Sequence, residues 1–299
     1  MKFVVTGGAG FIGNNIVKKL LKNGHSVSVI DNLHTGRKEN MASFQKDVDF
    51  YKIDIRDFDE LRKILKNIDG VFHEAALTIV QESYLKSDEY FDVNVKGTEN
   101  ILKIAKEQNF KIVYASSSSI YGDTTIIPIK EKFPRKPINP YGQTKLEDEF
   151  LAEKFSEGDV DVIGLRYFNV YGKGQTGTYA GVITKFINKL KEKESPEIFG
   201  DGSQIRDFVF VEDVADANLS AMKSNINNGF FNIGSGKTTS IKELAYMMIK
   251  IFGEELEPVF LDPLKGDVKK SQADISNSKN KLNWKYKTEL NEGLSKFLK

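Results

Sequence analysis

A glycine-rich turn between a short apolar strand and a helix places the strongest constraint on what this chain can fold into. Residues 2–6 read as a strand, and the run from Gly8 to Gly13 that follows has the spacing G-x-G-x-x-G. Residues 10–23 then carry apolar side chains at helical spacing. Glycines let a backbone approach a phosphate closely, and a helix N-terminus supplies amide donors to it. This order of elements predicts a phosphate-binding turn.

An aspartate at the end of the next predicted strand indicates the class of ligand. Residues 26–30 form that strand, and Asp31 and Asn32 follow it. A carboxylate at this place accepts hydrogen bonds from ribose hydroxyls and would repel a 2′-phosphate, so the pattern favours NAD over NADP. The alternative is a tight strand–helix turn followed by an ordinary turn aspartate, and the coincidence of all the parts argues against it.

Strands and helices continue to alternate along the sequence. Further strands are expected at 48–53, 71–73, 111–115, 160–166 and 230–233, and helices at 58–65, 89–108, 141–155, 214–224 and 241–252. This alternation implies right-handed βαβ units, so we expect an α/β fold with a Rossmann-type doubly wound parallel sheet. Residues 1–168, with about 206–234, are expected to form the NAD-binding domain. Residues of about 169–205 and 235–299 are expected to form a smaller C-terminal substrate-binding lobe.

Composition excludes several other functions. The chain has 299 residues, of which 40% are hydrophobic and 28% charged, so a packed core is expected and disorder is not. A net charge of +1 gives no general attraction to nucleic acid or to acidic membranes, and no apolar run is long enough for a transmembrane helix. Cysteine is absent, which excludes disulfides and thiolate catalysis, and the few histidines are scattered. We therefore expect a cytoplasmic protein without a metal.

Tyr141 and Lys145 form a second candidate site. They are spaced i and i+4 on a predicted helix, so both side chains lie on one face. A neighbouring ammonium and a positive nicotinamide ring would favour the phenolate and make it a better base. Tyr246 and Lys250 have the same spacing but lie in an apolar packing helix. The serines at 116–119 precede the first pair at a strand end, where α/β sheets place ligands; the alternative is a polar loop and a solvated helix start.

Taken together, the motifs resemble the extended short-chain dehydrogenase/reductase family and, within it, the UDP-glucose and UDP-N-acetylglucosamine 4-epimerases. They follow the family's order over nearly the whole chain. The matching segments are 6–13 (TGGAGFIG), 29–33 (VIDNL), 54–57 (DIRD), 73–76 (HEAA), 94–98 (NVKGT), 115–122 (ASSSSIYG), 140–145 (PYGQTK), 166–172 (RYFNVYG), 200–202 (GDG) and 206–208 (RDF).

The resemblance implies roles for individual residues. The catalytic residues would be Ser117, Tyr141 and Lys145. NAD would be bound by Gly7, Gly10, Phe11, Ile12, Gly13, Asp31, Asn32, Asp54, Ile55, Asn94, Tyr141 and Lys145. The UDP-sugar would be bound by Ser117, Ser118, Tyr141, Asn169, Arg206, Lys269 and Ser271.

Three of these positions depend on the resemblance most strongly. Lys269 stands where the family usually carries an arginine for the diphosphate, and lysine offers a point charge instead of a two-pronged donor. Ser271 aligns with a position that limits the space around the sugar 2-substituent, and a small residue there suggests room for an N-acetyl group. Without the motif, Arg206 and Asp207 would be interpreted as a surface ion pair.

The reaction that the resemblance implies is NAD-dependent 4-epimerisation of a UDP-hexose. Tyr141 would take the 4-hydroxyl proton, C4 would give up hydride to NAD, and the 4-keto sugar would turn over before both return. Related dehydratases and decarboxylases place an acid near the catalytic threonine, whereas Ser118, Ser119 and Ile120 follow Ser117 here.

Several alternatives stay open at this point. The sugar belongs to the glucose, N-acetylglucosamine or glucuronate series, so a UDP-glucuronate 4-epimerase or another NAD-dependent nucleotide-sugar-modifying enzyme is the nearest rival. A non-catalytic NAD-binding regulator is a different class of protein, although it would not need Ser117, Tyr141 and Lys145 together. The resemblance also predicts a homodimer, formed through the helices that contain 94–108 and 141–155.

Overall fold

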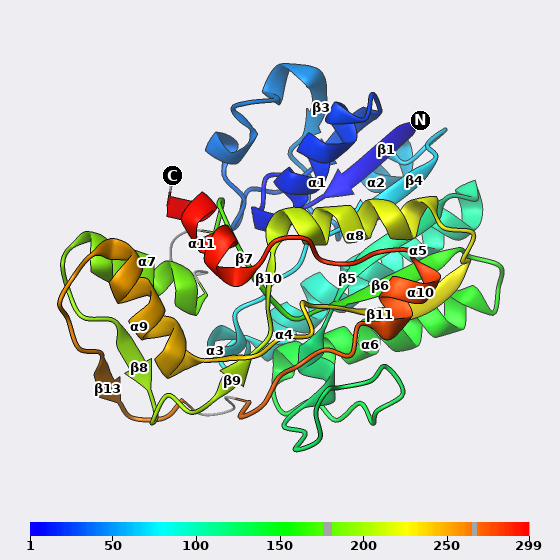
Figure 1. Ribbon diagram of the computed structural model, residues 1–299. Helices are drawn as coiled ribbons and strands as arrows, with labels where there is room; N and C mark the ends of the chain where they lie inside the picture. Colours follow the sequence, from blue (N-terminus) through cyan, green and yellow to red (C-terminus); the bar gives the residue numbers. More distant parts are fainter. Residues whose placement is uncertain (176–180, 265–267, 299) are drawn as a thin grey trace.

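A seven-stranded parallel sheet forms the centre of the molecule, with helices on both of its faces (Figure 1). The structure is a computed structural model that describes residues 1–175, 181–264 and 268–298. In sheet order the strands are β11 (Asn228–Ile233), β6 (Val162–Tyr167), β5 (Lys111–Ser117), β4 (Gly70–His73), β1 (Lys2–Thr6), β2 (Ser26–Ile30) and β3 (Val48–Tyr51). The strand order reverses between β1 and β4, which creates the crevice where such sheets bind ligands. The predicted Rossmann-type class is confirmed.

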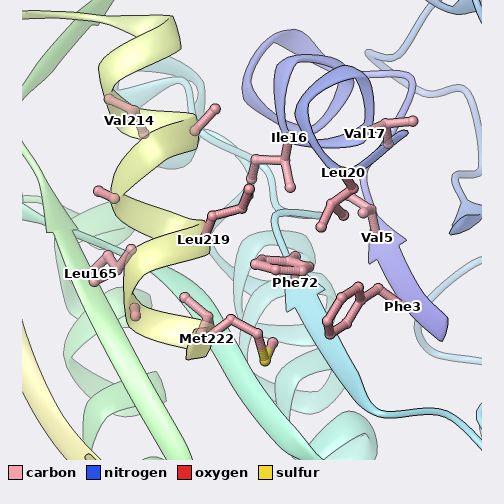
Figure 2. Close-up of a cluster of buried hydrophobic side chains, with 14 of the residues drawn as sticks. Phe3, Val5, Ile16, Val17, Leu20, Phe72, Leu165, Val214, Leu219 and Met222 are labelled. Atoms are coloured by element: carbon pink, nitrogen blue, oxygen red, sulfur yellow. The ribbon is translucent and has the colours of Figure 1, made fainter. Parts of the chain in front are cut away.

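One face of the sheet is covered by α1 (Phe11–Lys22) and α8 (Val211–Lys223). Ile16 and Leu20 of α1 and Leu219 of α8 pack together over Phe72 of β4, as Figure 2 shows. Burying a side chain of this size contributes about 1.5–3 kcal/mol, so this cluster fixes the two helices on the strands that carry the glycine turn.

The other face is covered by helices that include the predicted catalytic helix. Leu61, Ile101 and Ala152 come from three different helices and share one hydrophobic cluster with Val71 of β4. The elements on this side and at its edges are α2 (Phe58–Ile64), α3 (Val80–Ser83), α4 (Ser87–Phe91), α5 (Gly97–Gln108) and α6 (Pro140–Ser156). Because α6 begins beside the carboxyl edge of the sheet, its first turns face the crevice.

Two predicted boundaries differ from the structure. The residues expected to form one helix at 89–108 are all helical, but a π-helical turn at Asp92–Lys96 divides the helix into α4 and α5. A π turn interrupts the regular ladder, and here it contains Asn94, whose buried amide bonds to a neighbouring loop. The strand expected at 111–115 continues to Ser117, so the candidate serines lie inside β5 and at its end.

A smaller group of elements lies beside the crevice (Figure 1). Its hydrophobic cluster contains Phe186, Ile198 and Leu244. Helix α9 has a complete capping box between Ser240 and Glu243, which explains why the sequence pattern located it well. The elements of this group are α7 (Val182–Lys191), α9 (Ile241–Phe252), α11 (Leu290–Leu298) and the strand pairs β7 (Asn169–Tyr171) with β10 (Phe208–Phe210), β9 (Ile205–Arg206) with β12 (Thr239–Ser240), and β8 (Glu197–Phe199) with β13 (Val259–Leu261).

The chain returns to the main sheet near its C-terminus. After α10 (Ser276–Lys281), Leu282 and Trp284 enter the same hydrophobic cluster as α1 and α8. The indole Nε1 of Trp284 donates a hydrogen bond to the Asp213 carbonyl at 2.9 Å. The proposed division into an NAD-binding domain and a smaller lobe at 169–205 and 235–299 stays a prediction.

Candidate active site

A cavity of about 650 Å³ opens at the carboxyl edge of the sheet, between the main sheet and the smaller group of elements. Both candidate motifs of the sequence contribute to its wall. The predicted site residues that line it are Gly7, Gly10, Phe11, Ile12, Gly13, Asp31, Asn32, Ile55, Ser117, Ser118, Tyr141, Lys145, Asn169, Arg206 and Ser271. Three others, Asp54, Asn94 and Lys269, are not part of its lining.

The glycine turn leaves no room for side chains between the turn and the first helix. A Cβ on Gly13 would lie 2.2 Å from the Gly7 carbonyl oxygen, and Gly7 itself has a φ of +70°. Gly10 is the N-cap of α1 and provides no side-chain hydrogen bond, so the amides of the first turn stay available to a ligand. The absence of an acidic residue in that turn preserves its positive potential. This cradle fits the diphosphate of a dinucleotide.

Asp31 is held rigidly at the end of β2. One carboxylate oxygen accepts the Ala9 N–H at 3.0 Å and the other accepts the Leu33 N–H at 2.8 Å. Burial raises the pKa of Asp31, while these two backbone N–H groups act in the opposite direction. A Cβ on Gly36 would lie 2.7 Å from this carboxylate, so the loop packs closely around it. The fixed acceptor beside the glycine turn fits a ribose diol.

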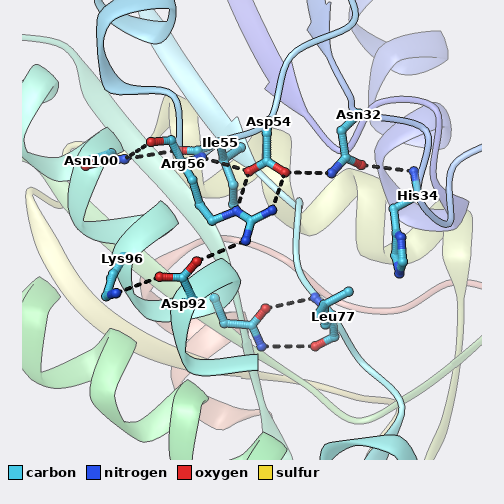
Figure 3. A network of polar contacts seen from close by, with 10 residues as sticks. Asn32, His34, Asp54, Ile55, Arg56, Leu77, Asp92, Lys96 and Asn100 are labelled. Atoms are coloured by element: carbon cyan, nitrogen blue, oxygen red, sulfur yellow. Dashed lines mark hydrogen bonds and ion pairs between the residues drawn. The ribbon is translucent and has the colours of Figure 1, made fainter. Parts of the chain in front are cut away.

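Asp54 lies outside the cavity lining, in the network of polar contacts that Figure 3 shows. Its carboxylate accepts hydrogen bonds from Asn32 Nδ2 at 3.0 Å and from two guanidinium nitrogens of Arg56 at 2.9 Å. The Arg56 hydrogen bond is the main reason why the pKa of Asp54 falls to about 2, against the effect of burial. Arg56 also pairs with Asp92 at 2.9 Å. This network holds Ile55 at the cavity wall.

The candidate catalytic pair, Tyr141 and Lys145, lies in the first turns of α6. Asn139 caps this helix by accepting the Gly142 N–H at 2.7 Å, and Tyr141 donates its backbone N–H to Ser83 Oγ at 3.2 Å. Lys145 is 3% exposed, and its Nζ lies 3.0 Å from Asp148 Oδ2. Burial acts to lower the pKa of Lys145, but the negative charge of Asp148, followed by Tyr141, outweighs it and the pKa rises. A permanent positive charge therefore lies beside the Tyr141 phenol.

Ser117 ends β5 opposite this pair. Its Oγ accepts the Ser119 N–H at 3.1 Å, which leaves the hydroxyl proton free to be donated to a ligand. The strand is tied to α6 through Glu149, which accepts the Ser116 hydroxyl at 2.7 Å and pairs with Arg166 at 2.8 Å. These buried contacts hold β5, which ends with the serine, against α6, which carries the tyrosine.

The far wall of the cavity is cationic. Arg206, 8% exposed, ends β9, and Asn169 begins β7. The interpretation of Arg206 and Asp207 as a surface pair is wrong, because Asp207 is fully buried and accepts N–H groups from Ser235, Gly236 and Ala273 at 2.6–2.9 Å. These bonds fix the strand that carries Arg206.

The structure does not bring Lys269 into the cavity, and Lys270 lines it instead. Lys269 is exposed, and its backbone N–H donates to Asp123 Oδ1 at 3.0 Å. Lys270 forms a bridge with Ile205, next to Arg206. Successive side chains of an extended backbone point to opposite sides, and this alternation was the signal that could have distinguished Lys270 from Lys269. Lys185 on α7 also lines the cavity, and it was missed because that helix was not predicted.

Two further positions show how the motifs act. Asn94 is fully buried; its side chain bonds to both backbone groups of Leu77, at 2.8 and 3.0 Å, and to Thr144 Oγ1 at 3.0 Å. It therefore holds a cavity loop against α6.

Glu74, in the HEAA segment, lines the cavity although no site role was predicted for it. Its position directly after a buried strand was the sequence signal that could have identified Glu74 as a site residue.

The described residues contain no group of three or more histidine, cysteine, aspartate or glutamate side chains placed to hold a metal ion. In the same part of the chain, none of the helices is long and apolar enough to cross a membrane.

Comparisons with known proteins agree with this geometry. Residues 3–234 match the model of the NAD dependent epimerase/dehydratase family. A UDP-glucose 4-epimerase of Mycolicibacterium smegmatis is 36% identical over 99% of this chain and 97% of its own length. The structure of a Thermotoga maritima UDP-glucose 4-epimerase with UDP-glucose superposes with a TM-score of 0.96 at 37% identity, covering 100% of this chain and 97% of that one.

A second solved structure broadens the range of sugars among the relatives. It is a UDP-N-acetylglucosamine 4-epimerase of Methanobrevibacter ruminantium in complex with UDP-N-acetylmuramic acid, with a TM-score of 0.95 and 37% identity over 99% of this chain and 96% of that one. The family match spans the glycine turn, the serine strand and the tyrosine helix together. The chain therefore belongs to the NAD dependent epimerase/dehydratase family.

Proposed function

We propose that the chain is an isomerase that interconverts UDP-glucose and UDP-galactose at C4 with NAD as its cofactor. The observation that carries this proposal is the convergence of Ser117, Tyr141 and Lys145 on one cavity between the glycine turn and Arg206. A binding protein would need the turn alone. A hydroxyl, a phenol and a buried ammonium in the wall of one cavity are the groups that alcohol oxidation and carbonyl reduction require.

Tyr141, Lys145 and Ser117 each have a distinct part in the proposed reaction. Tyr141 takes the proton of the sugar 4-hydroxyl and later returns it, while Lys145 stabilises the phenolate. Ser117 donates its hydroxyl proton to the same sugar oxygen, which remains an acceptor in the 4-keto form. NAD, when bound, supplies the site that accepts and returns hydride at C4.

The cationic wall supports a UDP-linked substrate. Arg206 can donate two parallel hydrogen bonds to a phosphate, and Lys270 adds a point charge beside it. Anchoring at the diphosphate would leave the sugar free to turn within the cavity. We propose Asn169 and Lys270 as the further diphosphate contacts, with Lys270 in place of Lys269.

A second candidate substrate is the N-acetylated pair. Ser271 is small, 7% exposed, and part of the cavity lining, so it leaves space where a larger side chain would fill it. The Methanobrevibacter structure belongs to a relative that is named for such a sugar. UDP-glucuronate is the third sugar to compare.

Turnover of a sugar panel tests the proposal directly. Purified protein should convert UDP-galactose to UDP-glucose, and the rates with UDP-N-acetylgalactosamine and UDP-glucuronate rank the alternatives. Tyr141→Phe should reduce turnover by roughly 10²–10⁴, the usual contribution of a positioned acid–base group. Tyr246→Phe is the matched control, because that tyrosine is exposed and bonds to Glu257 outside the cavity. A Tyr141→Phe enzyme with the rate of the control would exclude Tyr141 from the chemistry.

We also propose a homodimer through α5 and α6. Phe91, which ends α4 just before the π turn that leads into α5, and Phe150 on α6 are each 45% exposed, so both offer apolar surface that a second copy could cover. Light scattering during gel filtration distinguishes the dimer from a monomer, and Phe150→Glu should shift the equilibrium to the monomer.

A further inference from the structure

Glu74 follows β4 directly and lies between the two halves of the catalytic site. Its backbone abuts the glycine turn, since a Cβ on Gly7 would lie 2.9 Å from the Glu74 carbonyl carbon. Its side chain is half-buried and lines the cavity. Its charge also interacts with Lys145 on α6. A ligand that reaches from the glycine turn to the catalytic pair therefore passes over this carboxyl group.

A chain of hydrogen bonds distinguishes the two carboxyl oxygens of Glu74. Asn218 Nδ2 donates to the Val214 carbonyl at 3.0 Å and to the Tyr167 hydroxyl at 2.7 Å. The Tyr167 hydroxyl in turn donates its own proton to Glu74 Oε1, at 2.9 Å. Oε1 is an obligate acceptor, and Oε2 has no hydrogen-bond partner among the described residues. When Glu74 is protonated, its proton resides on Oε2.

The surroundings of Glu74 let this group titrate near neutral pH. Burial raises the pKa of Glu74 to about 8, although the Tyr167 hydroxyl and Lys145 act against this rise. The adjacent His73 stays neutral, because burial and then Lys145 lower its pKa to about 3. Lys145 stays charged, since its pKa is raised.

The remaining ionisable groups nearby lie on α6. Burial raises the pKa of Asp148 to about 6, so it is ionised above neutral pH. Tyr141 is the other titratable group that faces this part of the cavity.

Building on the proposed function, we propose that Glu74 sets the balance between the oxidised and reduced forms of the bound dinucleotide. The nicotinamide ring is positively charged in NAD⁺ and becomes neutral when it gains a hydride from C4–H. A carboxylate beside the ring therefore stabilises NAD⁺ more than NADH, whereas a neutral carboxylic acid does not. When Glu74 is ionised, its negative charge favours NAD⁺ and makes acceptance of hydride less favourable. When Glu74 is protonated, this effect is absent.

The relative affinity for the two dinucleotides measures this effect without any turnover. Protein is equilibrated with an excess of NAD⁺ and NADH in known ratio, passed rapidly through a desalting column, and the bound nucleotides are quantified. The series runs from about pH 6.5 to about pH 9.5, on both sides of the Glu74 transition. In the wild type, the NADH preference should fall by roughly tenfold as the pH rises, which is the factor equivalent to one pKa unit of charge coupling.

Glu74→Gln should keep the low-pH preference across the whole series. The amide carbonyl still accepts the Tyr167 hydroxyl, so the fold is retained, and urea denaturation checks this. Tyr167→Phe removes the donor that lowers the pKa of Glu74, so the transition should move to higher pH. Glu107→Gln is the matched control, because Glu107 is an exposed glutamate paired with Arg62 and should behave like the wild type.

Each outcome decides between the two proposals. A wild-type preference that does not change with pH, or a Glu74→Gln variant that follows the wild-type curve, overturns the role of Glu74 even if UDP-galactose is epimerised. A protein that retains neither dinucleotide at any pH overturns the proposed function itself.

Discussion

Replacing Gly13 by alanine should damage the fold and the dinucleotide site together. A Cβ at this position would lie 2.2 Å from the Gly7 oxygen, 2.8 Å from the Gly7 carbonyl carbon and 2.9 Å from the Gly8 Cα. Optimal heavy-atom contacts are about 3.5–4.0 Å, and all three neighbours are backbone atoms that cannot rotate away. The turn must therefore move by roughly an ångström, which breaks the bond from the Gly10 N–H to the Gly7 oxygen.

The cost follows from these contacts. Overpacking of this kind costs about 1–3 kcal/mol, and the lost backbone hydrogen bond adds about 1 kcal/mol. We expect the free energy of unfolding to fall by about 2–4 kcal/mol. A hydrogen bond to a charged group contributes about 1.5–3 kcal/mol, so misplacing even one amide donor should weaken NAD binding by roughly tenfold or more.

Gly24→Ala separates this steric effect from the conformational preference of glycine. Gly24 has a φ of +75°, and a Cβ added there would meet no atom within 4 Å, so alanine costs only the left-handed conformation, about 1–2 kcal/mol. Urea denaturation and calorimetric titration with NAD measure both variants. The steric reasoning fails if Gly13→Ala is no less stable than Gly24→Ala and binds NAD with unchanged affinity.

Two other predictions concern the cationic wall and a buried histidine. Lys270→Ala should raise the KM for the UDP-sugar by roughly tenfold, whereas Lys269→Ala should change it less than about twofold, because only Lys270 of these two lines the cavity; equal effects in steady-state kinetics would contradict this assignment. Because the pKa of His73 is about 3 when folded and near 6.5 when unfolded, the stability it contributes is present above 6.5 and lost as pH falls towards 3. His73→Gln should reduce the dependence of the free energy of unfolding on pH, measured by urea denaturation, by up to about 1.4 kcal/mol per pH unit in this range. An unchanged dependence would refute the prediction.

The sequence was sufficient to predict those features that depend on local chemistry. Short apolar runs located the strands of the main sheet, because parallel strands that are buried on both faces consist almost entirely of apolar residues. The glycine turn and Asp31 were predictable because few other arrangements need that spacing. Tyr141 and Lys145 face the cavity because a helix brings i and i+4 to one side.

The features that were not predicted depend on contacts between distant segments. The π turn around Asn94 is matched to a loop that precedes it by many residues, so no local pattern encodes it. The paired strands of the smaller group are two or three residues long, too short for any periodicity. Whether Lys269 or Lys270 faces inward is decided by the bridge to Ile205, and a shift of one residue reverses the answer.

The position of Trp284 has a consequence for how the molecule is made. This indole completes a hydrophobic layer that includes residues of α1 and α8, yet it is translated long after both helices. During synthesis the nascent Rossmann layer would stay open on that side, with Leu282 and Trp284 still missing. A translating ribosome stalled just after β11 should therefore carry a loosely folded, protease-sensitive intermediate, and protection should arise only once the late tryptophan emerges.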